Sequence, residues 1–221
     1  MMNAKLLALF SGFPTRQFPP DIAARLKEAL PCRRSLVFIS AWPSEFDRND
    51  QDAAGMHGMF TQYDMGFEQF TVIDERTDAM DAQHLIRNAD CIFLMGGNPT
   101  LQHQLIGEKG MADAIRQCRA VVLGVSAGSI NMARRALDIW ESPVPYEGLE
   151  LVDITIKAHI TPDSDLLPRL QQISLEHALP ICAMEDESAI FVQEGQISCI
   201  GQIRYICGGE IRPFSPVLLC H

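Results

Sequence analysis

The sequence predicts an α/β protein with three layers: a mostly parallel central sheet with helices on both faces, and antiparallel hairpins toward the C-terminus. Three observations predict this architecture. The first 130 residues alternate short apolar runs with segments of helical spacing. Most of the apolar runs are continuous, as in strands that are buried on both faces. After residue 180 the strand-like segments lie too close together for parallel crossovers, which leaves hairpins.

Five strands are predicted in the N-terminal part of the chain. They are Lys5–Phe10, Ser35–Ser40, Gln69–Ile73, Cys91–Met95 and Ala120–Val125. The intervening segments predict helices over Asp21–Leu30, Asp47–Tyr63, Ala79–Asn88 and Thr100–Gln117. The last of these contains Gly107 and Gly110, where a break is expected. This repeated alternation favours right-handed βαβ units and therefore one parallel sheet.

The last third of the chain has a different pattern. A helix is predicted over Ala127–Ala136, a strand over Ile154–His159 and a further helix over Asp165–Leu179. Four short strands follow: Ile181–Met184, Ser188–Val192, Gln196–Ile200 and Ile203–Cys207. Glycine turns between them predict an antiparallel extension at one edge of the parallel sheet. Because no stretch has the composition of a linker, we expect residues 1–221 to form one domain.

The composition excludes several function classes. Lys and Arg number 18 against 28 for Asp and Glu, so the net charge is −10. Nucleic-acid binding is disfavoured because it needs a basic face. No apolar run reaches the 18 or more residues of a membrane span, so no membrane partner is expected. The seven cysteines are widely spaced without a CxxC pair. This pattern favours reduced thiols in the cytoplasm, with neither a disulfide framework nor a metal site.

The clearest local motif is Gly124-Val125-Ser126-Ala127-Gly128, which lies between an apolar strand and a predicted helix. In a G-x-S-x-G elbow of this kind, a sharp turn exposes the serine hydroxyl above the sheet. The glycines relieve crowding in the turn. The motif therefore predicts that Ser126 is a nucleophile. The alternative is a tight turn in which the serine is buried as a helix cap.

A second glycine turn, Met95-Gly96-Gly97-Asn98, follows the preceding predicted strand. If the two strands are neighbours, both loops emerge at the same edge of the sheet, where open α/β sheets bind ligands. The backbone N–H groups of Gly97 and Ala127 would then form an oxyanion hole for acyl transfer. Considered alone, the Gly-Gly-Asn-Pro segment is an ordinary turn.

A histidine and a carboxylate would complete such a site. Among six histidines, His159 is distinguished because it closes a predicted strand and precedes a loop, a position suited to a pocket. The alternative is a packed loop histidine. Five carboxylates are candidates for orienting this base, and spacing does not choose among them: Glu185, Asp186, Glu187, Asp138 and Glu141.

Together these segments resemble peptidase family S51, which includes dipeptidase E and, more distantly, cyanophycinase. The specific part is the Gly-Gly-Asn block at 96–98 and the Ser-Ala-Gly block at 126–128, about 30 residues apart. The looser part is the strand-end His159 and the segment Glu185-Asp186-Glu187-Ser188-Ala189. The resemblance extends from about Lys5 to Gly209.

The resemblance implies a class I glutamine amidotransferase-like fold with serine in place of the amidotransferase cysteine. It implies Ser126 as nucleophile, His159 as general base, and Gly97 and Ala127 as oxyanion donors. The family's acid corresponds best to Asp186, where dipeptidase E and cyanophycinase have Glu. An earlier placement of the family's acid, on the loop after the nucleophile helix, would correspond to a position near 141.

The predicted function is a cytoplasmic serine hydrolase that cleaves small peptides, as a dipeptidase does, with N-terminal Asp-X as one option. Asn98 and Arg169 are the candidate substrate-binding residues, Arg169 as the cation for an acidic side chain. No cofactor is expected, and the partners are a small peptide substrate and, in one option, a second copy in a homodimer. Two alternatives are a glutamine amidotransferase-like enzyme and a non-catalytic binding or regulatory member of the same fold.

Overall fold

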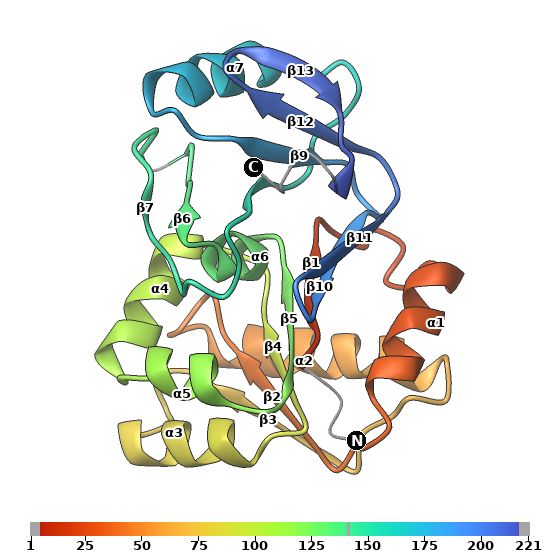
Figure 1. Cartoon of the computed structure of the whole chain (residues 1–221). Helices are drawn as coiled ribbons and strands as arrows, with labels where there is room; N and C mark the ends of the chain where they lie inside the picture. The colour runs from red at the N-terminus through yellow and green to blue at the C-terminus, as the bar shows by residue number, and fades with distance from the viewer. Residues whose placement is uncertain (1–4, 141, 217–221) are drawn as a thin grey trace.

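The structure is a computed structural model that describes residues 5–140 and 142–216 (Figure 1). Its helices are α1 (Pro20–Ala29), α2 (Phe46–Thr61), α3 (Ala79–Asn88), α4 (Pro99–Glu108), α5 (Ala112–Gln117), α6 (Ala127–Met132) and α7 (Leu167–Glu176). Its strands are β1 (Leu7–Phe10), β2 (Ser35–Ile39), β3 (Gln69–Ile73), β4 (Cys91–Leu94), β5 (Val121–Val125), β6 (Arg135–Ala136), β7 (Tyr146–Glu147), β8 (Thr155–Lys157), β9 (Ile181–Met184), β10 (Ala189–Gln193), β11 (Gln196–Ile200), β12 (Ile203–Cys207) and β13 (Glu210–Pro213).

A seven-stranded sheet with the order β11-β10-β1-β5-β4-β2-β3 forms the centre of the fold. Strands β1 to β5 are parallel, and β10 and β11 continue the sheet antiparallel beyond β1. One core cluster joins the sheet to α1 and α2, through Ile22, Leu26 and Phe60. A second cluster lies on the other face and includes Ile86 of α3 and Leu105 of α4. The predicted three-layer α/β architecture is therefore confirmed (Figure 1).

A second sheet, with the order β13-β12-β9-β8, lies above the carboxyl edge of the first, together with α7 (Figure 1). The prediction that β9 and β12 join hairpins at the edge of the main sheet is wrong. All four residues of β9 are buried. Cys182 and Met184 contribute to the core below, and Ile181 and Ala183 pack with the residues under α7. A strand that is apolar on both faces needs apolar cover on both. Within the second sheet, β9 has the core below on one face and the residues under α7 on the other.

The helix after Ser126 ends at Met132 and is therefore shorter than the predicted Ala127–Ala136. The returning chain captures its last carbonyl groups: Leu149 N–H donates to Asn131 O and Leu151 N–H donates to Met132 O. Residues 135–136 then pair with β7 instead of continuing the helix. Strand β8 likewise ends at Lys157, two residues before His159. The strand β13 was not predicted.

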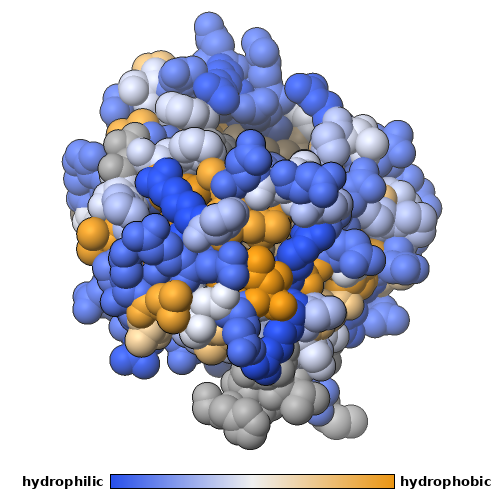
Figure 2. All heavy atoms as spheres, turned by 90° about the horizontal axis from the view of Figure 1, so that it is seen from above, coloured by the Kyte–Doolittle hydropathy of each residue, from blue (hydrophilic) through white to orange (hydrophobic). Residues whose placement is uncertain are grey.

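Viewed over α7 and β13, most of the surface is polar, and apolar residues gather near the middle of this face (Figure 2). Leu175 of α7 and Ile211 of β13 are among the exposed large apolar residues. A homodimer stays a prediction. Within residues 5–140 and 142–216, no helix combines the length and the apolar character that a membrane crossing requires.

The glycines of the elbow allow α6 to lie directly against the sheet. A Cβ atom added to Gly128 would lie 2.1 Å from the backbone oxygen of Leu94 in β4. A Cβ atom on Gly124 would lie 2.7 Å from the carbonyl carbon of Gly128. Both glycines are therefore required by packing, independently of any chemistry at Ser126.

Gly128→Ala is accordingly expected to lower the free energy of unfolding by about 1–3 kcal/mol, the usual cost of overpacking a rigid core. Urea denaturation measures the change. Gly107→Ala is the matched control, since a Cβ there meets no atom within 4 Å. Because Gly107 lies in α4, Gly107→Ala should leave the free energy of unfolding unchanged or raise it by up to about 1 kcal/mol. Equal stability of the two variants would contradict the packing argument.

Candidate active site

Ser126 lies at the turn between β5 and α6, at the carboxyl edge of the main sheet. Its backbone has φ +50° and ψ −110°, a conformation rare for a residue with a side chain. Two hydrogen bonds hold the turn: Ser126 N–H donates to Phe10 O, and Ile130 N–H donates to Ser126 O, both at 3.0 Å. The side chain does not cap the helix. The hydroxyl is therefore available to other groups.

His159 and Asp186 follow β8 and β9, which are parallel neighbours in the second sheet. The carboxyl ends of these strands lie side by side, so the two side chains meet. His159 Nδ1 lies 2.7 Å from Asp186 Oδ1, and His159 Nε2 lies 2.9 Å from Ser126 Oγ. A proton on Nδ1 satisfies the carboxylate and leaves Nε2 to accept from the serine hydroxyl. The structure thus brings these three predicted residues into one hydrogen-bonded chain.

Ser11 and Gly12, at the end of β1, hold the histidine and the aspartate in place. The buried Ser11 hydroxyl accepts from His159 N–H at 2.8 Å and lies 3.3 Å from Asp186 Oδ1. A Cβ on Gly12 would lie 2.6 Å from both Asp186 Oδ1 and His159 Cε1. Sequence reasoning missed both residues. The available signal was a small polar pair directly after a buried strand, at the edge where the other loops emerge.

The other candidate acids have different partners. Glu185 forms an ion pair with Arg204 at 2.8 Å, and Glu187 accepts a hydrogen bond from Thr15 at 3.2 Å. Asp138 accepts from the backbone N–H of Trp140 at 3.0 Å. The remaining candidate, residue Glu141, lies outside the described residues. Among the described carboxylates that were considered, only Asp186 contacts His159.

The two predicted oxyanion donors line one pocket with Ser126 and His159, of about 320 Å³. Gly97 has φ +141°, and a Cβ there would lie 2.3 Å from the indole nitrogen of Trp42. The conformation and the crowding both require glycine. Neither Gly97 N–H nor Ala127 N–H donates to another residue in the described part of the chain. Both donors therefore remain available to a ligand.

Comparisons with known proteins give the family and the fold of this chain. The sequence model of peptidase family S51 matches residues 9–200, most of the chain. This chain belongs to peptidase family S51. It is accordingly a serine-type peptidase. A search of curated proteins finds no match.

Two crystal structures share the S51 fold of this chain. A peptidase from an acI-B1 Actinobacterium aligns with a TM-score of 0.71 at 15% identity, over 97% of this chain and 95% of its own. A putative peptidase E from Listeria monocytogenes EGD-e aligns with a TM-score of 0.68 at 20% identity, over 90% of this chain and 98% of its own. At these identities the likeness concerns the fold.

The two predicted substrate-binding residues of this S51 peptidase lie apart from each other. Asn98 is the N-cap of α4, and its side-chain oxygen accepts from Leu101 N–H at 2.9 Å. Arg169 lies exposed on α7 and does not line the pocket that contains Ser126. The Asn98 side chain therefore caps α4 directly after the Gly-Gly turn, and Arg169 lies outside the wall of the pocket.

Two charged residues line this pocket: Lys157, which sequence reasoning missed, and Asp138, which it considered only as an acid for His159. Lys157, the last residue of β8, is 6% exposed, and Asp138 is 5% exposed. Lys157 Nζ donates to Ala158 O at 2.8 Å and lies 5.8 Å from the centre of the Trp140 ring. Burial lowers the pKa of Lys157, and the charge of Asp138 partly offsets this effect. A buried cation and a buried carboxylate thus lie beside the serine.

The described residues contain no group of three or more His, Cys, Asp or Glu side chains arranged to hold a metal ion. His159 exposes 48% of its side chain and Asp186 exposes 38%. The site is open to solvent, so a bound substrate would itself have to exclude water from the histidine.

Proposed function

We propose that this S51 peptidase cleaves small peptides, as a dipeptidase does, through an acyl-enzyme on Ser126. The observation that carries the proposal is the hydrogen-bonded chain from Ser126 Oγ through His159 to Asp186, with links of 2.9 and 2.7 Å. This is the arrangement of nucleophile, base and orienting acid that recurs in serine hydrolases on unrelated folds.

In the proposed reaction, Ser126 Oγ attacks the peptide carbonyl carbon while His159 Nε2 takes the hydroxyl proton. The backbone N–H groups of Gly97 and Ala127 donate to the oxyanion. The C–N bond then breaks, and His159 returns the proton to the leaving amine. A water molecule, deprotonated by the same nitrogen, attacks the ester carbonyl carbon. The C–O bond to Ser126 then breaks, and His159 returns the proton to Ser126 Oγ. Asp186 keeps the proton on Nδ1 and stabilises the imidazolium.

The charges of the pocket favour a substrate whose N-terminal residue lies inside it. Asp138 is suited to a substrate α-ammonium group, and Lys157 to a side-chain carboxylate. The two groups are buried, so each interaction would be little screened by water. We therefore propose that peptides with an acidic N-terminal residue, such as Asp-X, are preferred, with Lys157 in the role that the sequence assigned to Arg169.

A fluorophosphonate probe tests the nucleophile. Labelling of the wild-type protein is expected, and Ser126→Ala and His159→Ala should abolish it, since the probe reacts with an activated serine. Circular dichroism shows that each variant is folded. A folded wild-type protein that neither reacts with the probe nor cleaves any dipeptide would contradict the proposal and would favour a non-catalytic binding member of the fold.

The preference for an acidic N-terminal residue is tested with Asp-Ala, Glu-Ala and Ala-Ala. Lys157→Gln is expected to lower kcat/KM for the acidic peptides about 10- to 100-fold, with little change for Ala-Ala, because one charge-assisted hydrogen bond is lost. Arg169→Gln is the comparison variant. If Arg169→Gln has the larger selective effect, the assignment to Lys157 is wrong and Arg169 binds the carboxylate.

A further inference from the structure

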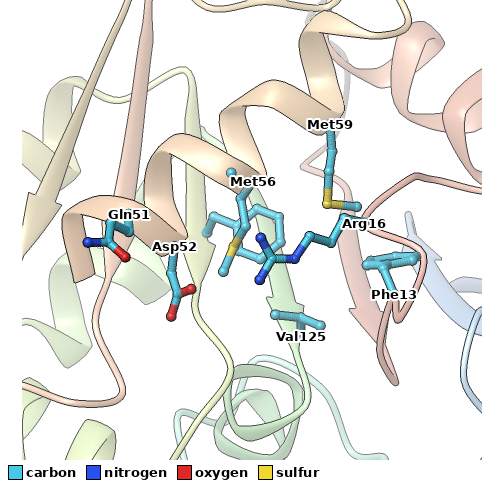
Figure 3. A pocket seen from close by; sticks show the side chains of 9 residues that line it. Phe13, Arg16, Gln51, Asp52, Met56, Met59 and Val125 are labelled. Carbon is cyan, nitrogen blue, oxygen red and sulfur yellow. The ribbon is translucent and has the colours of Figure 1, made fainter. Parts of the chain in front are cut away.

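A second pocket, of about 160 Å³, opens at the same edge of the main sheet (Figure 3). It lies between α2 and the loop that follows β1. Its walls include Met56 and Met59 of α2, Phe93 at the end of β4, and Phe13 and Val125. These residues belong to, or pack against, the core cluster on the α1 and α2 face. The pocket that contains Ser126 includes Ile130 of the opposite cluster, so the two pockets lie on opposite faces of the sheet.

Two residues that line the second pocket are sequence neighbours of residues at the reacting groups. Val125, in its wall, directly precedes Ser126. Phe13 directly follows Gly12, which packs against the imidazole of His159 and the carboxylate of Asp186. In a serine hydrolase the histidine donates its proton to the leaving amine, so the residue after the cleaved bond must lie on the histidine side. The loop from Gly12 to Arg16 leads from the histidine to this pocket.

Arg16 is the cation of this pocket. Figure 3 shows its guanidinium group directed across the opening, over Met56. Arg16 forms no ion pair with another described residue, whereas Asp52, the carboxylate of the same pocket, lies 3.6 Å from Arg48. The backbone of Arg16 has φ +54° and is held by a hydrogen bond from its N–H to Phe13 O. This hydrogen bond fixes the turn that carries the guanidinium group.

The remaining walls suit an apolar side chain. A dry cavity of about 150 Å³ can hold a benzene molecule, so this pocket can hold an aromatic ring or a branched aliphatic chain. The two methionines can adapt to side chains of different shape. An apolar group next to an unpaired guanidinium matches one chemical unit of a peptide: a C-terminal residue with an apolar side chain and a free carboxylate.

We propose that this pocket binds the C-terminal residue of a dipeptide substrate, with its side chain among Met56, Met59 and Phe93 and its carboxylate on Arg16. The inference rests on the proposed function, because it takes Ser126 and His159 as the reacting groups. It gives the enzyme a physical reason to prefer dipeptides. A longer peptide carries an uncharged amide at the position where Arg16 would meet the carboxylate.

Binding is measured first, so that the result does not depend on turnover. Isothermal titration of Ser126→Ala protein with Asp-Leu and Asp-Leu amide is expected to show about tenfold or tighter binding of the free acid. Adding Arg16→Gln should abolish this difference without weakening the amide. Arg87→Gln, a surface arginine of α3, is the control and should retain the difference. Equal affinity for Asp-Leu and Asp-Leu amide in the Ser126→Ala protein that retains Arg16 would overturn the carboxylate assignment.

The apolar part is tested by filling the pocket from a glycine. Gly55 of α2 lines it, and a Cβ there meets no atom within 4 Å, so Gly55→Leu should fold and project into the pocket. Gly58→Leu is the matched control, on the same helix, equally free of contacts and outside the wall. Gly55→Leu should lower kcat/KM for Asp-Leu and Asp-Phe about tenfold more than for Asp-Gly. Equal effects of the two variants would overturn the proposed subsite.

The two proposals fail in different ways. If Ser126→Ala protein binds Asp-Leu through Arg16 but the wild-type protein cleaves no peptide, the proposed function is wrong and the carboxylate site stands. If the wild-type protein cleaves Asp-Leu while Arg16→Gln and Gly55→Leu behave as their controls, the hydrolase stands and the subsite is wrong. Another preferred N-terminal residue, if the panel reveals one, replaces Asp in all these peptides.

Discussion

Ser126→Ala and His159→Ala are each expected to lower kcat roughly a million-fold, and the double variant to lower it no further. The non-additivity follows because the two side chains act as one unit: a serine without its base is not a nucleophile, and a base without the serine has no proton to take. Asp186→Asn should cost about 10,000-fold, since an amide in this position favours the wrong imidazole tautomer. Rates of dipeptide hydrolysis measure all four.

The neighbouring carboxylates provide matched controls for Asp186. Glu185→Gln loses an ion pair with Arg204, and Glu187→Gln loses one hydrogen bond with Thr15. Both contacts lie outside the hydrogen-bonded chain, so kcat should stay within about threefold of wild type. Partly exposed pairs of this kind contribute about 0–1 kcal/mol to stability. If Glu185→Gln or Glu187→Gln has the larger effect on kcat, Asp186 is not the acid.

The main sheet and the position of the serine were predictable from sequence because their signals are local. Continuous apolar runs such as Cys91–Leu94 mark strands buried on both faces, and these runs coincide with the observed strands. The glycines around Ser126 mark the strand-to-helix turn, since α6 must approach the sheet within a distance that no side chain allows. Each of these signals depends on a few consecutive residues.

The second sheet was not predictable, and spacing alone did not choose the acid, because both depend on contacts between distant segments. Only the family resemblance favoured Asp186. Whether β9 pairs with β10 or with β8 depends on which layer covers each of its faces. That pairing in turn places Asp186, rather than its neighbours, against His159. Lys157 was read as part of a strand, and only the packing of the loop with Asp138 and Trp140 over it shows that it is buried in the pocket.

Gly97→Ala is expected to lower kcat about 100- to 1,000-fold, with a smaller change in KM. The added methyl group would meet the Trp42 indole at 2.3 Å, and φ +141° is unfavourable for alanine. The turn must therefore shift, which moves the Gly97 N–H away from the oxyanion. Loss of one such donor in other serine hydrolases costs about 3–4 kcal/mol in the barrier. Steady-state kinetics on the preferred dipeptide measures the change.

Gly96→Ala separates this effect from a general disturbance of the loop. A Cβ on Gly96 would lie 3.6 Å from its nearest neighbours, Val125 Cγ1 and Val125 O, which is ordinary contact. This variant should keep kcat within about threefold of wild type, although it adds the same methyl group one residue earlier. If both variants lose activity equally, the loop tolerates no side chain at either position and the donor role of Gly97 is unsupported. If only Gly97→Ala loses kcat, the effect follows the position of one backbone N–H, since the serine, the histidine and the aspartate are unchanged.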